Sequence, residues 1–146
     1  MIILTKKFKF SAAHRYQNPR WSEEENLAAF GDDSRLHGHN YELEVSLTGE
    51  VDPDTGFLAD LDLIKALVQE HVLDLLDHAH IEADIPWFAE RQPTTENIVR
   101  YIWEQLSPRI MDDVRLTRIR LYETPTIYAE FDGRAGEIQP HQGDIQ

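Results

Sequence analysis

Two histidines of the sequence have the spacing of metal ligands on a β-strand. His37 and His39 flank Gly38 at the start of a segment that alternates apolar and polar residues. Because side chains at i and i+2 of a strand project from the same face, both imidazoles can reach one metal ion. His14 ends another alternating segment and would supply a third imidazole. Three histidines with an open fourth position are typical of a catalytic zinc site.

A structural role explains the same histidines equally well. A His-x-His motif is short enough to occur by chance. A buried imidazole at position 14 could bond a backbone carbonyl, while His37 and His39 face water. The spacing of these residues alone leaves both interpretations open.

Two further positions could take part in chemistry. Asp77 and His78 are adjacent at the end of a helical pattern, and a carboxylate beside an imidazole can form an acid/base pair. The alternative is a histidine that interacts with the helix dipole, which spacing alone favours. Glu123 lies at the end of a predicted strand, on the same face as its apolar residues, and could accept two parallel hydrogen bonds from an N–H/NH2 edge, such as that of a pterin or a guanine. Without other information, a solvent-facing acid is the favoured interpretation there.

Periodicity places these residues on six elements. Period-two alternation predicts four strands, and apolar residues three and four apart predict two helices. The order ββααββ indicates an α+β fold whose helices cover one face of an antiparallel sheet. The expected strands are 2–14, 36–47, 115–123 and 127–131; the helices run from Asp60 or Asp62 to about Asp77 and from Thr94 or Thr95 toward Pro108; loops occupy 15–35, with room for a short helix, and 78–93.

Composition limits the class of protein. The 146 residues carry 14 Lys and Arg against 27 Asp and Glu, a net charge of −13, and no Cys. Disulfide scaffolds, cysteine-ligated metal sites and thiol nucleophiles are therefore excluded. Without a basic block, neither nucleic acid nor an anionic membrane is an expected partner. We expect a single domain over 1–132 with a polar tail over 133–146. We expect it in the cytoplasm, since the sequence shows neither a signal peptide nor a membrane-spanning run of about 18 apolar residues.

Several motifs, in this order and spacing, resemble the 6-pyruvoyltetrahydropterin synthase family. That family includes the 6-carboxytetrahydropterin synthases of queuosine biosynthesis. The resemblance extends from residue 5 to about residue 131, and an ordered set is more specific than any one motif. The matching segments are Phe10 to His14, His37 to Tyr41, Thr55-Gly56, Leu76 to His78, Pro93 to Glu96 and Tyr122 to Thr124.

The resemblance implies a tunnelling fold (T-fold) with a four-stranded antiparallel sheet and two helices on one face. It also implies a homohexamer of two trimers and a lyase that acts on a substrate like 7,8-dihydroneopterin triphosphate. By resemblance, His14, His37 and His39 would bind Zn2+, and Asp77 and His78 would transfer protons. Glu123 would anchor the pterin ring, and Thr94, Thr95 and Glu96 would line its pocket.

One position departs from the family. Members carry a catalytic Cys shortly before the His-Gly-His motif, where this chain has Asp33. A carboxylate with an ordinary pKa of about 4 is a weaker base than a thiolate with one of about 8.5, although burial would raise the former. We therefore expect a zinc-dependent pterin synthase with Asp33 as its base. The alternative is a paralogue that binds zinc and pterin without the standard turnover; an unrelated three-histidine zinc hydrolase is less favoured.

Overall fold

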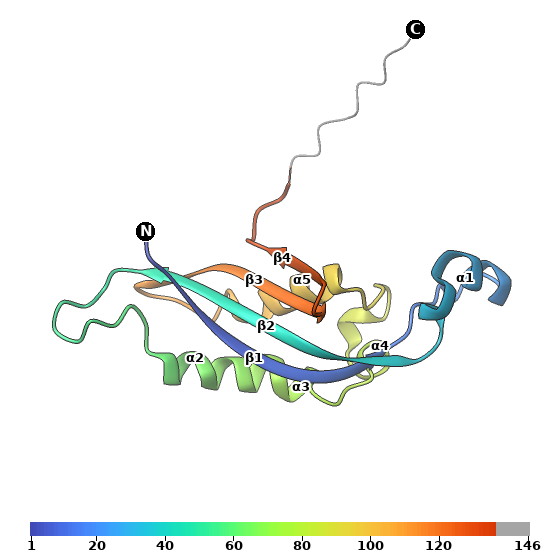
Figure 1. The fold of residues 1–146 in the computed structure, drawn as a ribbon, viewed down its shortest axis with the longest axis horizontal. Helices are drawn as coiled ribbons and strands as arrows, with labels where there is room; N and C mark the ends of the chain where they lie inside the picture. Colours follow the sequence, from blue (N-terminus) through green and yellow to red (C-terminus); the bar gives the residue numbers. More distant parts are fainter. Residues whose placement is uncertain (137–146) are drawn as a thin grey trace, which may run out of the picture.

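All four predicted strands are present in the computed structural model, which describes residues 1–136. They form one antiparallel sheet in the order β1-β2-β3-β4 (Figure 1). The strands are β1 (Ile3–His14), β2 (His37–Gly49), β3 (Val114–Thr124) and β4 (Ile127–Phe131). The bounds of β4 are those predicted, and those of the other three strands differ by one or two residues. The predicted tail lies partly outside the described residues, so the division at residue 132 stays a prediction.

The alternating apolar residues fix how β1 and β2 pair. Phe10 lies opposite Tyr41, and His14 lies opposite His37. Phe10, Tyr41 and Leu43 are all buried on the face that the helices cover. A slip of one residue would turn this set toward solvent, so burial of the apolar face determines the register.

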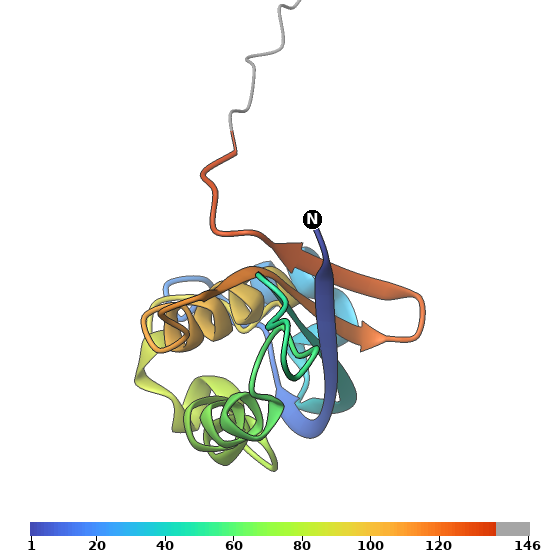
Figure 2. The same cartoon turned by 90° about the vertical axis from the view of Figure 1, so that its left-hand side faces the viewer.

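Two helical segments cover that face of the sheet, as Figures 1 and 2 show. The first consists of α2 (Leu61–Val68), a π-helical turn (Gln69–Leu73) and α3 (Asp74–Leu76), and the second is α5 (Thr95–Leu106). Both predicted helices are thereby confirmed. Of the alternative N-caps, the structure uses Asp60, which accepts from two backbone N–H groups, and Thr94, which accepts from one.

Both long loops contain helical structure, and the second contains more than the sequence indicated. The segment 78–93, predicted as a loop, includes the short helix α4 (Ile81–Asp84) and a 3-10 turn (Pro86–Phe88). That prediction was wrong because Ile81, Ile85 and Phe88, spaced by four and three, bury their side chains. The long polar loop holds α1 (Glu23–Phe30), at the end of the sheet where β1 ends (Figure 1).

The segment after α3 covers the outer edge of β1 near its end. His78 N donates to Ser11 O at 2.6 Å, and Ala13 N donates to Ala79 O at 2.8 Å. The Asp77 carboxylate accepts from Ser11 N at 3.0 Å. Edge hydrogen bonds therefore hold Asp77 and His78 beside the strand that ends in His14. Within residues 1–136, no helix has the length and apolar character to cross a membrane.

We expect Leu43→Ala to destabilise the protein by about 2–5 kcal/mol, because truncating a buried leucine loses transfer free energy and leaves a cavity. Leu43 is fully buried in the centre of the sheet, whereas Leu63 is 57% exposed on α2. Leu63→Ala is therefore the matched control, with an expected loss within about 0.5 kcal/mol. Urea denaturation followed by circular dichroism measures both, and equal losses would contradict this placement of the core.

Candidate metal centre

Three imidazoles converge where β1 ends and β2 begins. His14 lies directly opposite His37 across the ladder, and His39 is opposite Ala12 on the same face. The ring centroid of His14 is 4.6 Å from that of His37 and 5.1 Å from that of His39. One nitrogen of each ring lies within 4.8 Å of the other two. The structure thus brings together the three histidines that the sequence singled out.

Backbone carbonyls fix how two of the rings are turned. Pro93 O lies 2.8 Å from His14 Nδ1, and Arg35 O lies 2.7 Å from His37 Nδ1. A carbonyl can only accept, so each Nδ1 carries the proton and each Nε2 offers a lone pair. The structural and metal-binding roles that the spacing left open are therefore compatible, because His14 bonds a carbonyl through one nitrogen and faces the cluster with the other.

The nitrogens that face one another fit a metal ion. Among residues 1–136, His14 Nε2 and His39 Nε2 are buried and have no hydrogen-bond partner. A buried polar atom without a partner is costly, and it marks a place where a ligand or ion would be bound. Imidazole nitrogens with a nearby carboxylate form a donor set that suits zinc.

Burial shifts the titration of the central histidine. The His14 side chain is completely buried. Its pKa is lowered from the ordinary value of 6.5, first by desolvation and then by His37 and His39, against the opposing effects of Pro93 O and Glu123. His14 therefore stays neutral to a lower pH than a free histidine, and the neutral ring is the form that binds metals.

Two carboxylates border the imidazole cluster. Glu123 Oε1 lies 3.7 Å from His14 Nε2 and 3.6 Å from His39 Nε2. Its side chain is only 14% exposed, so the interpretation of Glu123 as a solvent-facing acid is wrong. Asp33 Oδ1 lies 3.7 Å from His37 Nε2, and its side chain is 60% exposed. Each imidazole therefore has a carboxylate oxygen close to its Nε2.

Sequence reasoning missed Tyr16, which joins the acids to the cluster. Its hydroxyl donates to Glu123 Oε1 at 3.3 Å, and its backbone N donates to Asp33 O at 2.9 Å. Its ring packs edge to face on His14, with centroids 5.0 Å apart. Burial, Glu123 and Asp33 raise the pKa of the Tyr16 hydroxyl, which remains a donor. The sequence did contain a sign of this role: Tyr16 follows His14 by two residues, so the alternation of β1, if continued, points both side chains to the same face.

The segment that begins α5 borders the same cluster. Pro93 O accepts from His14 Nδ1, and the Thr94 hydroxyl caps the helix by accepting from Asn97 N. Thr95 is buried, and the charge of Glu96 adds to the rise in the Tyr16 pKa. The three predicted pocket residues thus follow directly on the residue that bonds His14, and their contact with a pterin stays a prediction.

Asp77 and His78 form a pair outside the imidazole cluster. His78 Nδ1 lies 3.0 Å from Asp77 Oδ1, and the His78 side chain is 84% exposed. The pKa of Asp77 is lowered, mainly because its carboxylate accepts from Ser11 N and then because of His78. Within residues 1–136, no hydrogen bond or ion pair links this pair to the cluster. His78 and His39 do line one shallow hollow of about 340 Å³.

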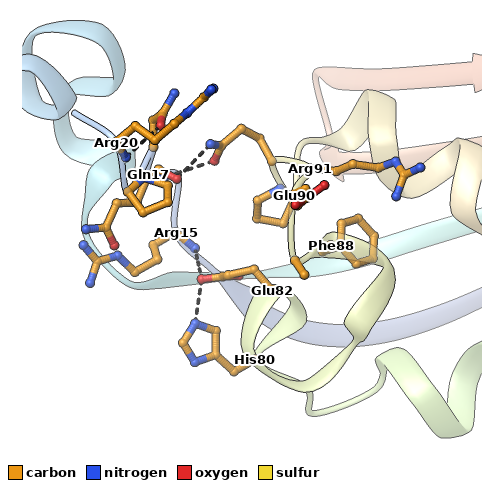
Figure 3. Close-up of a pocket in the computed structure, with 13 residues that line it drawn as sticks. Arg15, Gln17, Arg20, His80, Glu82, Phe88, Glu90 and Arg91 are labelled. Carbon is orange, nitrogen blue, oxygen red and sulfur yellow. Dashed lines mark hydrogen bonds and ion pairs between the residues drawn. The ribbon is translucent and has the colours of Figure 1, made fainter.

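A larger hollow, of about 880 Å³ (Figure 3), includes in its wall Pro93, whose carbonyl oxygen bonds His14 Nδ1. Glu82 crosses it and accepts from Arg15 N at 3.0 Å, while His80 Nε2 lies 2.6 Å from the same oxygen. Arg15 Nε is buried without a hydrogen-bond partner.

Three arginines give this hollow its positive charge: Arg15, Arg20 and Arg91. The Arg91 guanidinium stacks on Trp87 at 4.2 Å and extends away from the other two (Figure 3). In the part of the chain that the structure describes, neither Arg15 nor Arg20 forms an ion pair. Arg91 forms no ion pair among these residues either, but its guanidinium also donates to Trp87 O at 3.0 Å, so Arg15 and Arg20 are the less engaged of the three.

Comparisons with known proteins agree with this architecture. The family model described as 6-pyruvoyl tetrahydropterin synthase matches residues 3–134. The 6-pyruvoyl tetrahydrobiopterin synthase of Pongo abelii is 37% identical over 89% of this chain and 90% of its own. The 6-carboxy-5,6,7,8-tetrahydropterin synthase of Rickettsia conorii is 26% identical over 89% of this chain and 99% of its own.

A solved structure of Caenorhabditis elegans 6-pyruvoyl tetrahydropterin synthase superposes with a TM-score of 0.84. It is 33% identical in sequence and covers 91% of this chain and 96% of its own. The T-fold expected from the sequence motifs is thereby confirmed.

The lowered pKa of His14 predicts how stability depends on pH in the metal-free protein. Between the folded pKa and 6.5, the unfolded chain binds more protons than the folded one, so the free energy of unfolding falls as pH falls below about 6.5. The loss is about 1.4 kcal/mol for each unit of pKa difference. His14→Gln should lack this component. Urea denaturation of both proteins across this pH range measures it, and identical pH profiles would contradict the prediction.

Proposed function

The chain belongs to the 6-pyruvoyl tetrahydropterin synthase family, and on this premise we propose that it is a zinc-dependent lyase acting on a reduced pterin. The proposed substrate resembles 7,8-dihydroneopterin triphosphate, and the reaction is of the 6-pyruvoyl or 6-carboxytetrahydropterin synthase type. The observation that carries this proposal is the convergence of three imidazole nitrogens beside a largely buried carboxylate.

The three histidines would hold the metal ion in a fixed position. Zinc, when bound, supplies Lewis-acid polarisation of side-chain oxygens, which makes the neighbouring C–H protons easier to remove. The carbonyls of Pro93 and Arg35 keep two of the rings turned toward the site. Such partners preserve the ring orientation and raise the basicity of the ligand nitrogen.

Asp33 is the proposed base, in the place where the family carries its Cys. Its carboxylate lies 3.7 Å from His37 Nε2, so a substrate at the metal would have it within reach. Asp77 and His78 are the proposed proton-transfer pair. Their mutual contact of 3.0 Å and the exposure of His78 support this role, because the imidazole is free to meet a substrate or a neighbouring subunit.

Glu123 is the proposed anchor of the pterin ring, with Thr94, Thr95 and Glu96 in the pocket wall. A carboxylate can accept two parallel hydrogen bonds from the N–H/NH2 edge of the ring. The low exposure of Glu123 supports this role, since water competes little for those bonds. The homohexamer and the cytoplasmic location stay predictions.

A binding protein without turnover is the second candidate. The observation that favours it is the 60% exposure of Asp33, which leaves this carboxylate in a more solvated setting than a catalytic base usually has. Such a protein would keep the three histidines and Glu123, and it would bind zinc and pterin without releasing product.

If Asp33 is the base, Asp33→Asn should lower product formation from 7,8-dihydroneopterin triphosphate by about 10²–10⁴-fold, the usual contribution of general base catalysis. Zinc and pterin binding should be unchanged, because the histidines and Glu123 remain. Chromatography of the products measures turnover, and Asp33→Cys should recover activity by restoring the thiol. Tight binding with no product from the unmodified protein would favour the binding role instead.

The triphosphate of this substrate needs local positive charge in a chain with a net charge of −13. We expect Arg20→Gln to raise KM by about tenfold or more with little change in kcat, since a hydrogen bond to a charged group contributes about 1.5–3 kcal/mol. Arg91→Gln is the matched control, because its guanidinium lies on Trp87 in the same hollow. Steady-state kinetics compare the two, and equal effects would argue against a phosphate site at Arg20.

A further inference from the structure

We infer that Glu123 is the fourth ligand of the metal centre when no substrate is bound. The resting centre would then consist of three imidazoles and one carboxylate, with no position open to water or to small anions. This inference rests on the proposed zinc site and adds a second role for the residue proposed to anchor the pterin ring.

Distances between the candidate ligand atoms support this arrangement. Zinc bonds of about 2.0–2.2 Å in a tetrahedral site place neighbouring ligand atoms about 3.3–3.5 Å apart. Glu123 Oε1 lies 3.6 Å from His39 Nε2 and 3.7 Å from His14 Nε2. The carboxylate oxygen is therefore within a few tenths of an ångström of a fourth ligand's position relative to both nitrogens.

Burial and charge point the same way. Glu123 is largely buried, and its ion-pair contacts within residues 1–136 are with the imidazoles of His14 and His39 rather than with Lys or Arg. A buried carboxylate is costly without a positive partner. The Nε2 atoms of the same two histidines are the ones left without a hydrogen-bond partner. One divalent cation would satisfy all three groups.

Tyr16 orients the oxygen concerned. Its hydroxyl donates to Glu123 Oε1 at 3.3 Å, the same oxygen that faces the two imidazoles. A carboxylate oxygen has two lone pairs and can accept this bond while it binds a cation. Residues that hydrogen-bond a ligating carboxylate commonly fix its direction, so Tyr16 acts as a positioning residue for Glu123.

The two roles of Glu123 exclude one another at any one moment. With one lone pair of Oε1 on the metal and the other accepting from the Tyr16 hydroxyl, that oxygen has none left for a pterin donor, so the carboxylate cannot close the metal centre and bind both donors of a pterin edge at once. Arrival of the ring would therefore draw Glu123 away and open the fourth position only in the presence of a pterin. The structure offers one competing ligand, Asp33, whose Oδ1 lies 3.7 Å from His37 Nε2.

Cobalt substitution tests the inference without relying on activity. The full-length protein is stripped with a chelator and loaded with Co2+, and its visible spectrum is recorded during titration with sodium azide. We expect no response from the unmodified protein and a clear response from Glu123→Ala, in which the fourth position is open. The affinity for Co2+ should fall by at least about tenfold in that variant, because even the loss of a group that only hydrogen-bonds a ligand costs about 10–100-fold.

Asp33→Asn is the matched control, because it neutralises the other carboxylate beside the cluster. Its spectrum should resist azide like that of the unmodified protein. Glu123→Gln, which keeps the size of the side chain, replaces the alanine variant if circular dichroism shows that the latter is unfolded; we expect the same azide response from it. A response of the unmodified protein at the same azide concentration as Glu123→Ala would overturn the inference, as would a response confined to Asp33→Asn. Absence of any Co2+ binding in the unmodified protein would instead contradict the proposed zinc site.

Discussion

The antiparallel register of β1 and β2 is the constraint on which the candidate site depends. It places His14 opposite His37 and Ala12 opposite His39, so three imidazoles share one face. The same register buries Phe10 against Tyr41, with ring centroids 4.9 Å apart. Since a slip of one residue would expose the apolar face, the free energy of core burial also enforces the geometry of the polar cluster.

The polar cluster lies at the end of an apolar core, which determines its electrostatic character. His14 is completely buried, and its hydrogen bond to Pro93 O offsets part of the cost of desolvation. Its Nε2 and the neighbouring Glu123 carboxylate have no such compensation from the described protein groups, apart from the hydroxyl of Tyr16. A low-dielectric site with neutral nitrogens and a negative oxygen favours a cation strongly, because screening by water is weak there.

Periodicity in the sequence predicted the strands, both long helices and the common face of the three histidines, because each of these follows from burial of one face of an element. It was not sufficient for distances between elements. The residues alone favoured a structural role for Asp77 and His78, and only the family resemblance assigned them to proton transfer; in the described structure they lie on the edge of β1 outside the cluster. The role of Tyr16 was missed because its partner, Glu123, is more than a hundred residues away in the sequence.

The loop before β2 positions Asp33, the proposed base, whereas the sheet positions the three histidines. The buried Asn26 side chain accepts from Asn18 N at 2.7 Å and donates to Ser22 O at 2.9 Å, which ties α1 to the start of the loop. The backbone N–H of Tyr16 then donates to the backbone carbonyl oxygen of Asp33 at 2.9 Å. Asp33 is therefore positioned by the loop's own hydrogen bonds, whereas the histidines are positioned by the sheet. We therefore expect a substitution at Asp33 to change the loop without disturbing the strands that carry the three histidines.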